Sequence, residues 1–465
     1  MGSSRRHSEG GRGPTTPATE TNSGDADASA ERSPLFDALA QLARVAYPVL
    51  LTEPNDPFRP SGPPGLFLVF LRHPAGKEFQ RLALADPALS RLVKQAGGAV
   101  STAAQIQTST GRGGGVQVEL LASLLIHSAH VRYVFRRHTT ETAYLADVAE
   151  VLSEARCLLQ GVEAEVPVLQ SFAFVTLPTG RSVKAPWGVL RAPSEAESDY
   201  GSRLIGGSLS YDDEFGSHAI QYSGDLILDA QVPMKAKVLD GPPEDQAWSQ
   251  TLETLEELER RGLLVSLAVT LAVEREKPAA AVPTWRVVLD PLDFGPSSSR
   301  RQTPTSLPVA APASLTDEEA TAVETWLEIL EQNDSHRTAM AARRIQSSIV
   351  ERSDPADGLV DAVVAWESLF GSREETTLRV SGSIACLLGT DLAKRLALQE
   401  ETKKIYNLRS RIVHGDAAAE APNVYDAWKR ACDIGIQVLR RLYRDRPDLL
   451  ALDPNERSLH LLLGD

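Results

Sequence analysis

The sequence predicts an α+β protein, in which a mixed α/β-rich N-terminal region precedes an all-α helical bundle. Short β-rich runs between Gly, Pro and Asp turns fill residues 166–289, a proline-rich stretch follows, and helical periodicity continues from there. The chain has 465 residues, enough for about three domains. Hydrophobic residues make up 42% of it, an ordinary share for a globular protein.

Five parts are expected along the chain. Residues 1–33 are rich in Gly, Ser, Thr and charge, which predicts a disordered tail and not a secretory signal. Four prolines, at positions 296, 304, 308 and 312, predict a linker. In chain order the parts are the tail at 1–33, an α+β region at 35–295 in one body or two packed subdomains, the linker at 296–313, the helical bundle at 314–450 and a C-terminal tail at 451–465.

The α+β region opens with helical spacing. Apolar residues recur at Leu35, Leu39, Leu42 and Ala46, which predicts a helix over residues 34–51. The other expected elements are a strand at 65–71, helices at 82–97 and 118–137, strands at 171–177, 226–228 and 285–289, and a Glu- and Leu-rich helix at 246–261.

The bundle shows the clearest helix signals. Thr316 and Glu319 have the spacing of a capping box, and Val323, Trp326 and Leu330 follow on one helical face. Further helices are expected at 338–352, 357–370, 374–388, 392–413 and 423–443. Three of these end at Gly371, Gly389 and Gly415, which predicts left-handed glycine caps.

Charge and cysteine usage limit the function classes. The net charge is −14, so a basic surface over the whole protein is excluded, although residues 401–446 hold ten basic and six acidic residues, a net of +4. That excess fits either RNA binding or a solvated helix face. Three scattered cysteines favour a reducing, cytoplasmic setting without structural zinc. No apolar run is long enough for a membrane span.

The segment from Arg409 to Gly415, RSRIVHG, is the main candidate for chemistry. Arg409 is permanently charged and His414 titrates near neutrality, so together they can hold or cleave a phosphodiester. Five helical residues turn the chain by about 500°, which leaves the two side chains about 140° apart around the axis. Either Arg409 swings toward His414 or the two residues act in different protomers.

Three stretches in this order resemble the Apea-like HEPN family. They are VVAWESLF at 363–370, the helix ending in LLG at 378–389, and KIYNLRSRIVHG at 404–415. The similarity covers residues 315–450, about a third of the chain. It implies a HEPN-type bundle that pairs into a homodimer across a cleft. It also implies a metal-independent endoribonuclease without cofactors, of a kind found in bacterial toxins and antiphage defence.

The residues suit that chemistry because RNA supplies its own 2′-hydroxyl nucleophile. His414 would move a proton at a helix C-terminus, and Arg409 would hold the non-bridging oxygens. The supporting residues are Ser410, Arg411, Tyr406 and Glu367. Glu367 either pairs with Arg409 across the bundle or faces solvent, and Tyr406 either supports the site or packs the bundle edge.

Two functions follow from the sequence. The first is RNA cleavage, with tRNA as one candidate substrate and the α+β region as a sensor or specificity module for a phage or cellular trigger. The second is a non-catalytic module that binds RNA or a protein partner through the same bundle. In that case His414 and Gly415 serve to end the helix.

Overall fold

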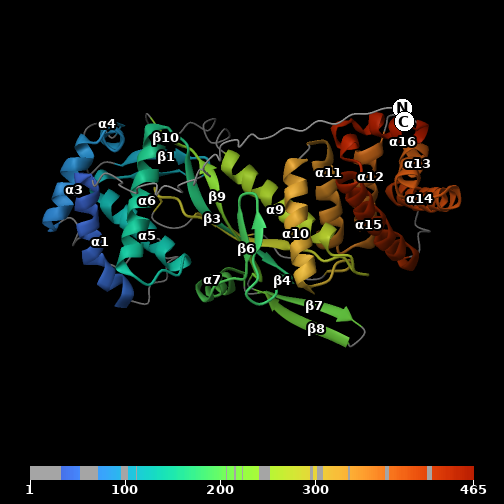
Figure 1. The fold of residues 1–465 in the computed structure, drawn as a ribbon, viewed down its shortest axis with the longest axis horizontal. Helices are drawn as coiled ribbons and strands as arrows, with labels where there is room; N and C mark the ends of the chain where they lie inside the picture. The colour runs from blue at the N-terminus through green and yellow to red at the C-terminus, as the bar shows by residue number, and fades with distance from the viewer. Residues whose placement is uncertain are drawn as a thin grey trace, which may run out of the picture.

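The computed structural model describes residues 33–52, 72–95, 103–111, 113–205, 207–213, 216–222, 224–239, 252–293, 297–300, 307–333, 336–371, 376–415 and 421–464. The predicted tail at 1–33, apart from its last residue, and the predicted strand at 65–71 lie outside these ranges. The fold is mixed α+β, and a central sheet separates a helical end from the helices of the C-terminal region (Figure 1).

Helices form the N-terminal end of the molecule. They are α1 (Pro34–Thr52), α3 (Pro74–Ala85), α4 (Ser90–Gln95), α5 (Val118–Phe135) and α6 (Glu141–Gln160). The apolar stripe of α1 is buried as its spacing predicts, and α5 matches the expected helix at 118–137. The single helix expected at 82–97 is wrong. Asp86 ends α3 and accepts hydrogen bonds from the backbone of residues 88 and 89 before α4 begins.

The central sheet is antiparallel, and its strand order is β12-β11-β3-β9-β6-β5. Its strands are β3 (Ala164–Ala173), β5 (Val183–Ala185), β6 (Gly188–Arg191), β9 (Leu226–Met234), β11 (Val282–Val288) and β12 (Ser297–Arg300). The register of β11 against β3 shifts between Pro283 and Arg286. All three predicted strands in the described ranges contribute to this sheet, but the end of the strand expected at 171–177 forms β4 (Val175–Thr176), which belongs to a separate two-stranded sheet.

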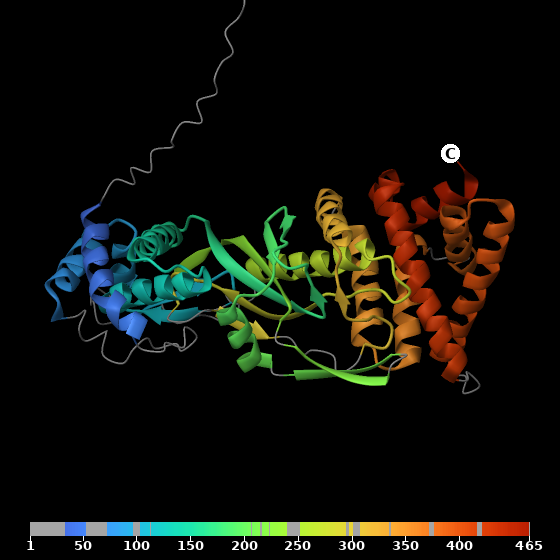
Figure 2. The same cartoon turned by 60° about the horizontal axis from the view of Figure 1, so that its bottom comes forward.

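Smaller elements flank the sheet. A three-stranded sheet contains β1 (Ala104–Thr108), β2 (Gly113–Val116) and β10 (Ala236–Leu239). The short helix α7 (Glu195–Ile205) precedes the hairpin of β7 (Gly207–Asp213) and β8 (Gly216–Tyr222), which projects from the body (Figure 2). The strand β13 (Ala313–Ser314) pairs with β4 in parallel.

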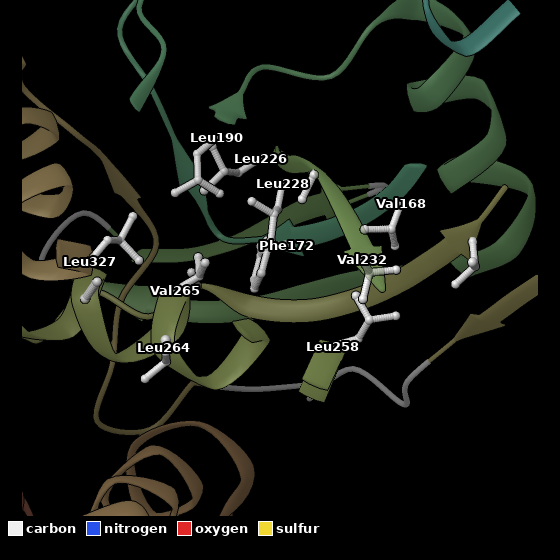
Figure 3. Close-up of a cluster of buried hydrophobic side chains, with 14 of the residues drawn as sticks. Val168, Phe172, Leu190, Leu226, Leu228, Val232, Leu258, Leu264, Val265 and Leu327 are labelled. Carbon is white, nitrogen blue, oxygen red and sulfur yellow. The ribbon is translucent and has the colours of Figure 1, made fainter. Parts of the chain in front are cut away.

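Helix α9 (Glu253–Ala272) joins the sheet to the C-terminal helices. Its side chain Val265 packs with Phe172 and Leu228 of the sheet, and Leu327 approaches from the C-terminal region (Figure 3). Burial of each such side chain stabilises the fold by about 1.5–3 kcal/mol. The helix expected at 246–261 is α9, which begins at Glu253 and continues eleven residues past the expected end, whereas residues 246–251 lie outside the described ranges. Gly262 does not end the helix, and its missing Cβ leaves room for the Gln170 amide.

The C-terminal region is helical. It comprises α10 (Asp317–Gln332), α11 (His336–Gln346), the π-helical turn η1 (Ser347–Glu351), α12 (Pro355–Phe370), α13 (Thr376–Leu388), α14 (Leu392–Val413), α15 (Ala421–Arg444), the 3₁₀ turn η2 (Pro447–Ala451) and α16 (Pro454–Leu463). The capping box of Thr316 and Glu319 is present at the start of α10. Trp326, Trp366 and Trp428 are fully buried between these helices.

Two of the three predicted glycine caps are wrong. Gly415 has a φ of +77°, but Gly371 has a φ of −68°, and Gly389 is not among the positive-φ glycines. A Cβ at Gly371 would lie 2.4 Å from the carbonyl oxygen of Glu367, and one at Gly389 would lie 2.7 Å from that of Ala385. Close approach to the preceding turn, and not left-handed backbone, explains these two glycines.

The segments predicted as a linker and a tail are packed where they are described. Residues 297–300 pair with β11, the Tyr425 hydroxyl donates to the Pro308 carbonyl at 2.8 Å, and Leu307 and Val309 are buried. Prolines prevent regular helix here but do not prevent burial. Within the predicted tail, α16 has its own capping box, and Arg457 is fully buried.

None of the helices in the described ranges combines the length and apolarity needed to cross a bilayer.

Candidate functional site

Helix α14 carries the motif. Asp391 caps its first turn by accepting a hydrogen bond from the Lys394 backbone at 2.9 Å, and Gly415 ends it with a left-handed conformation. Only Thr402 and Ile405 are buried along its length. The helix therefore lies at the outer edge of the C-terminal region, where most of its surface faces solvent (Figure 2).

Arg409 lies on the side of α14 that faces α12. Its Nη2 atom donates to Oε2 of Glu367 at 3.3 Å, and the two side chains are only 20% and 25% exposed. The pairing of Glu367 with Arg409, one of the two alternatives left open by the sequence, is thus present. It links two helices across a partly desolvated gap, where an ion pair is screened less than at the surface.

Tyr406 shares the same carboxylate. Its hydroxyl donates to Oε1 of Glu367 at 2.5 Å. Burial and, after it, the hydrogen bond to Glu367 raise the pKa of Tyr406 to about 12, so the phenol stays protonated and donates at neutral pH. Glu367 therefore accepts from two residues one turn of α14 apart, which fixes the position of both.

The Arg409 guanidinium keeps an unused donor. Its Nε atom is buried and has no hydrogen-bond partner among the described residues. A buried donor without a partner costs about 1–3 kcal/mol. A buried donor without a partner in a folded protein requires an explanation, and one explanation is that a ligand supplies the hydrogen-bond acceptor.

His414 stands apart from this cluster. It is exposed at the C-terminal end of α14, and its backbone N–H closes the last turn onto the Ser410 carbonyl at 3.1 Å. Ser410 is half-buried one turn earlier, and Arg411 is exposed. In the described part of the chain no hydrogen bond or ion pair joins His414 to Arg409, as the 140° between them predicts.

The solvent face of α14 contains unusual apolar exposure. Leu392 is 72% exposed and Leu396 is 61% exposed. At 100° per residue these leucines share a face with Ser410 and His414. The exposed histidine thus lies at one end of a face whose other end is apolar.

No group of three or more His, Cys, Asp and Glu side chains in the described ranges is arranged to hold a metal ion. His127 and His130 of α5 are both buried, and burial lowers the pKa of each. The Nδ1 atom of His138 lies 3.0 Å from Oδ2 of Asp147, on α6.

Two polar features have no counterpart in the sequence analysis. One is a buried network around Arg132, which is ion-paired with Glu154 and donates to the Leu289 carbonyl at 2.8 Å. The other is a cavity of about 450 Å³ between the sheet and the C-terminal helices. The residues of both come from elements far apart in the chain. The sequence offers one signal for the network: Arg132 is a charged residue within the mostly apolar helix α5, and a charge buried there needs a partner.

Comparison with protein-family models, with curated proteins and with solved structures gives no match to this chain. The residues of α14 and their contacts are therefore the basis for assigning a function.

Proposed function

We propose that the C-terminal region is a metal-independent endoribonuclease of HEPN type, in which Arg409 and His414 carry the reaction. The observation that carries the proposal is the incomplete hydrogen bonding of the Arg409 guanidinium. Glu367 holds its guanidinium through one atom, while the Nε atom stays buried and unpaired among the described residues. A phosphate oxygen is an acceptor that a guanidinium binds well.

The chemistry needs few groups. The 2′-hydroxyl of RNA attacks the adjacent phosphorus, the bond to the 5′-oxygen breaks, and the products carry a 2′,3′-cyclic phosphate and a 5′-hydroxyl. His414 moves a proton in this step, and Arg409 stabilises the charge on the non-bridging oxygens. Glu367 and Tyr406 position Arg409, and Ser410 and Arg411 lie beside it on α14.

Two copies of the chain are needed for a complete site. Arg409 and His414 point about 140° apart, so one helix cannot present both to one phosphate without rearrangement. A two-fold dimer places the Arg409 of one protomer near the His414 of its partner. The exposed Leu392 and Leu396 supply the apolar area that such a contact would bury.

The alternative is a module that binds RNA or a protein partner without cleaving it. The ion pair between Arg409 and Glu367 favours this alternative, because Glu367 holds Arg409 and most of the Arg409 side chain is buried. In this case Arg409 and Tyr406 brace α14 against α12, and His414 ends the helix. The α+β region then acts as the specificity module for binding, as it does for cleavage in the first proposal.

The direct test incubates the full chain with total tRNA in excess EDTA and analyses the product ends. We expect cleavage that leaves 2′,3′-cyclic phosphates and that falls on the order of 10²-fold in His414→Ala, as for loss of an acid–base group. His460→Ala, which removes an exposed histidine on α16, is the matched control and should cleave like the wild type.

Arg409→Lys should also fail, because an ammonium cannot replace a guanidinium fork on phosphate. Retained binding of RNA without any cleavage would favour the non-catalytic alternative. Equal cleavage by the wild type and by His414→Ala would remove the catalytic assignment.

A further inference from the structure

The cavity between the sheet and the C-terminal helices has features of a binding site. Its walls come from β3, α9, β11, α11 and η1, which meet at the junction of the two halves of the molecule (Figure 1). Its volume of about 450 Å³ lies in the range of small-molecule sites. None of its lining residues belongs to the α14 site.

The inner wall contains an unsatisfied acceptor. Gln170 of β3 is 4% exposed, and its Oε1 atom has no hydrogen-bond partner among the described residues. Its amide packs over Gly262 of α9, where a Cβ would lie 2.3 Å from Nε2. The glycine therefore makes room for a buried amide whose oxygen remains unpaired. A ligand N–H group at this wall would satisfy it.

Two walls have irregular backbone. The β3–β11 register shifts between Pro283 and Arg286, with Pro283 on the cavity wall. On the opposite side, α11 passes into the π-helical turn Ser347–Glu351, and Ser347, Val350 and Glu351 line the cavity. Strand bulges and π-helical turns both occur preferentially at functional sites.

Two arginines of α11, Arg343 and Arg344, line the cavity. Arg344 donates to Asp361 at 2.6 Å, whereas the exposed Arg343 has no carboxylate partner within the described ranges. Glu259 and Glu351 also line the cavity, so a ligand with several negative charges would be repelled. Met340, which is 49% exposed beside Arg343, offers a polarisable surface for an aromatic ring.

From these groups we infer that the cavity binds a nucleoside monophosphate. The base donates an N–H to Gln170, and the single phosphate accepts from Arg343. This inference does not rest on the ribonuclease proposal, because the two sites share no residue. Since the walls belong to both halves of the chain, the bound ligand also bridges the α+β region and the C-terminal helices.

Calorimetric titration of the full chain tests the inference with four probes. They are adenosine 5′-monophosphate, guanosine 5′-monophosphate, adenosine without phosphate and ribose 5-phosphate without a base. We expect a monophosphate to bind, and Arg343→Gln to weaken it at least about tenfold, as for loss of a charge-assisted hydrogen bond. Adenosine should bind more weakly and should be insensitive to Arg343→Gln.

Further variants locate the binding. Gln170→Leu should weaken monophosphates and adenosine alike, whereas Lys77→Gln, an exposed change on α3, should alter neither. His414→Ala should bind as the wild type does, which separates this cavity from the α14 site. Absence of binding by both monophosphates, or equal binding by wild type and Arg343→Gln, would overturn the inference. The exposed position of Arg343 keeps this test valid if Gln170→Leu does not fold.

Discussion

Single residues show where sequence reasoning succeeds and where it stops. The motif and its neighbours indicate Arg409, Tyr406 and Glu367 as site residues, and these three do meet, because α12 and α14 pack side by side. The Nε atom of Arg409 and the Oε1 atom of Gln170 have no hydrogen-bond partner among the described residues, which could not be predicted. Hydrogen bonding at these two side chains depends on the residues that surround them in the folded protein, which the local sequence does not specify.

Asp290 offers a pH test of the buried network around Arg132, because its carboxyl interacts electrostatically with Arg132 and Glu154. Burial, as the main cause, raises the pKa of its carboxyl to about 7 from an ordinary 3.8, although its Oδ1 accepts from the Leu292 backbone at 2.8 Å. Between about pH 4 and pH 7 the folded protein therefore holds a proton that the unfolded chain has lost. The contribution of Asp290 to stability is present below that window and is lost as pH rises through it.

Asp290→Asn removes this titration. We expect the stability of the variant relative to wild type to increase by a few kcal/mol from pH 4 to pH 7, measured by urea unfolding at each pH. Comparison with the wild type at the same pH is required because His130, whose pKa burial lowers to about 4, acts with the opposite sign in that range. A stability difference that does not change with pH would show that Asp290 is ionised in the folded protein.

At the scale of elements, helix caps and apolar stripes predict helices reliably, whereas a segment without such signals can still be helical. The capping box of α10 and the apolar stripes of α1 and α10 are as the sequence predicts. The sequence signals do not predict α6, and α16 falls in the predicted C-terminal tail. The glycines that end α12 and α13 were identified, but for the wrong reason, since a tight contact and a left-handed turn both select glycine.

Gly358 gives an element-scale test, because it sets how closely α12 and α15 approach. A Cβ there would lie 2.2 Å from the Trp428 ring, whose Nε1 donates to Ser348 at 2.8 Å. Gly358→Ala should therefore destabilise the protein by about 1–3 kcal/mol, despite the better helix propensity of alanine. Denaturant unfolding measures the change.

Gly114→Ala is the matched control, because nothing lies within 4 Å of its added Cβ, and we expect a change within about 0.5 kcal/mol. A Gly358→Ala protein as stable as the control would mean that the two helices can separate at little cost.

At the scale of the whole molecule, the α+β class is predictable from the sequence, but the packing of the two regions against each other is not. One hydrophobic core runs from α1 to η2. Arg440 of α15 donates to the carbonyls of Leu271 and Val273 at 2.9 Å, which closes the C-terminal end of α9. Periodicity identifies the apolar face of each helix but does not say which partner covers it.

A fragment of residues 314–465 should therefore fold poorly. It loses α9, which packs against α10, α11 and α15, and so exposes apolar faces. We expect aggregation or a broad, weakly cooperative thermal transition by circular dichroism. A chain of residues 34–465 is the truncation control and should unfold like the full protein. A fragment that melts cooperatively within a few degrees of the full chain would show that the bundle folds independently.

The most direct measurement of the central claim mixes two inactive variants. Arg409→Ala and His414→Ala proteins are combined, allowed to exchange subunits and assayed on RNA in EDTA. If each site takes its arginine from one protomer and its histidine from the partner, a mixed dimer retains one intact site, and activity returns to about a quarter of the wild-type value. A mixture no more active than either variant alone, beside an active wild type, would contradict the composite site.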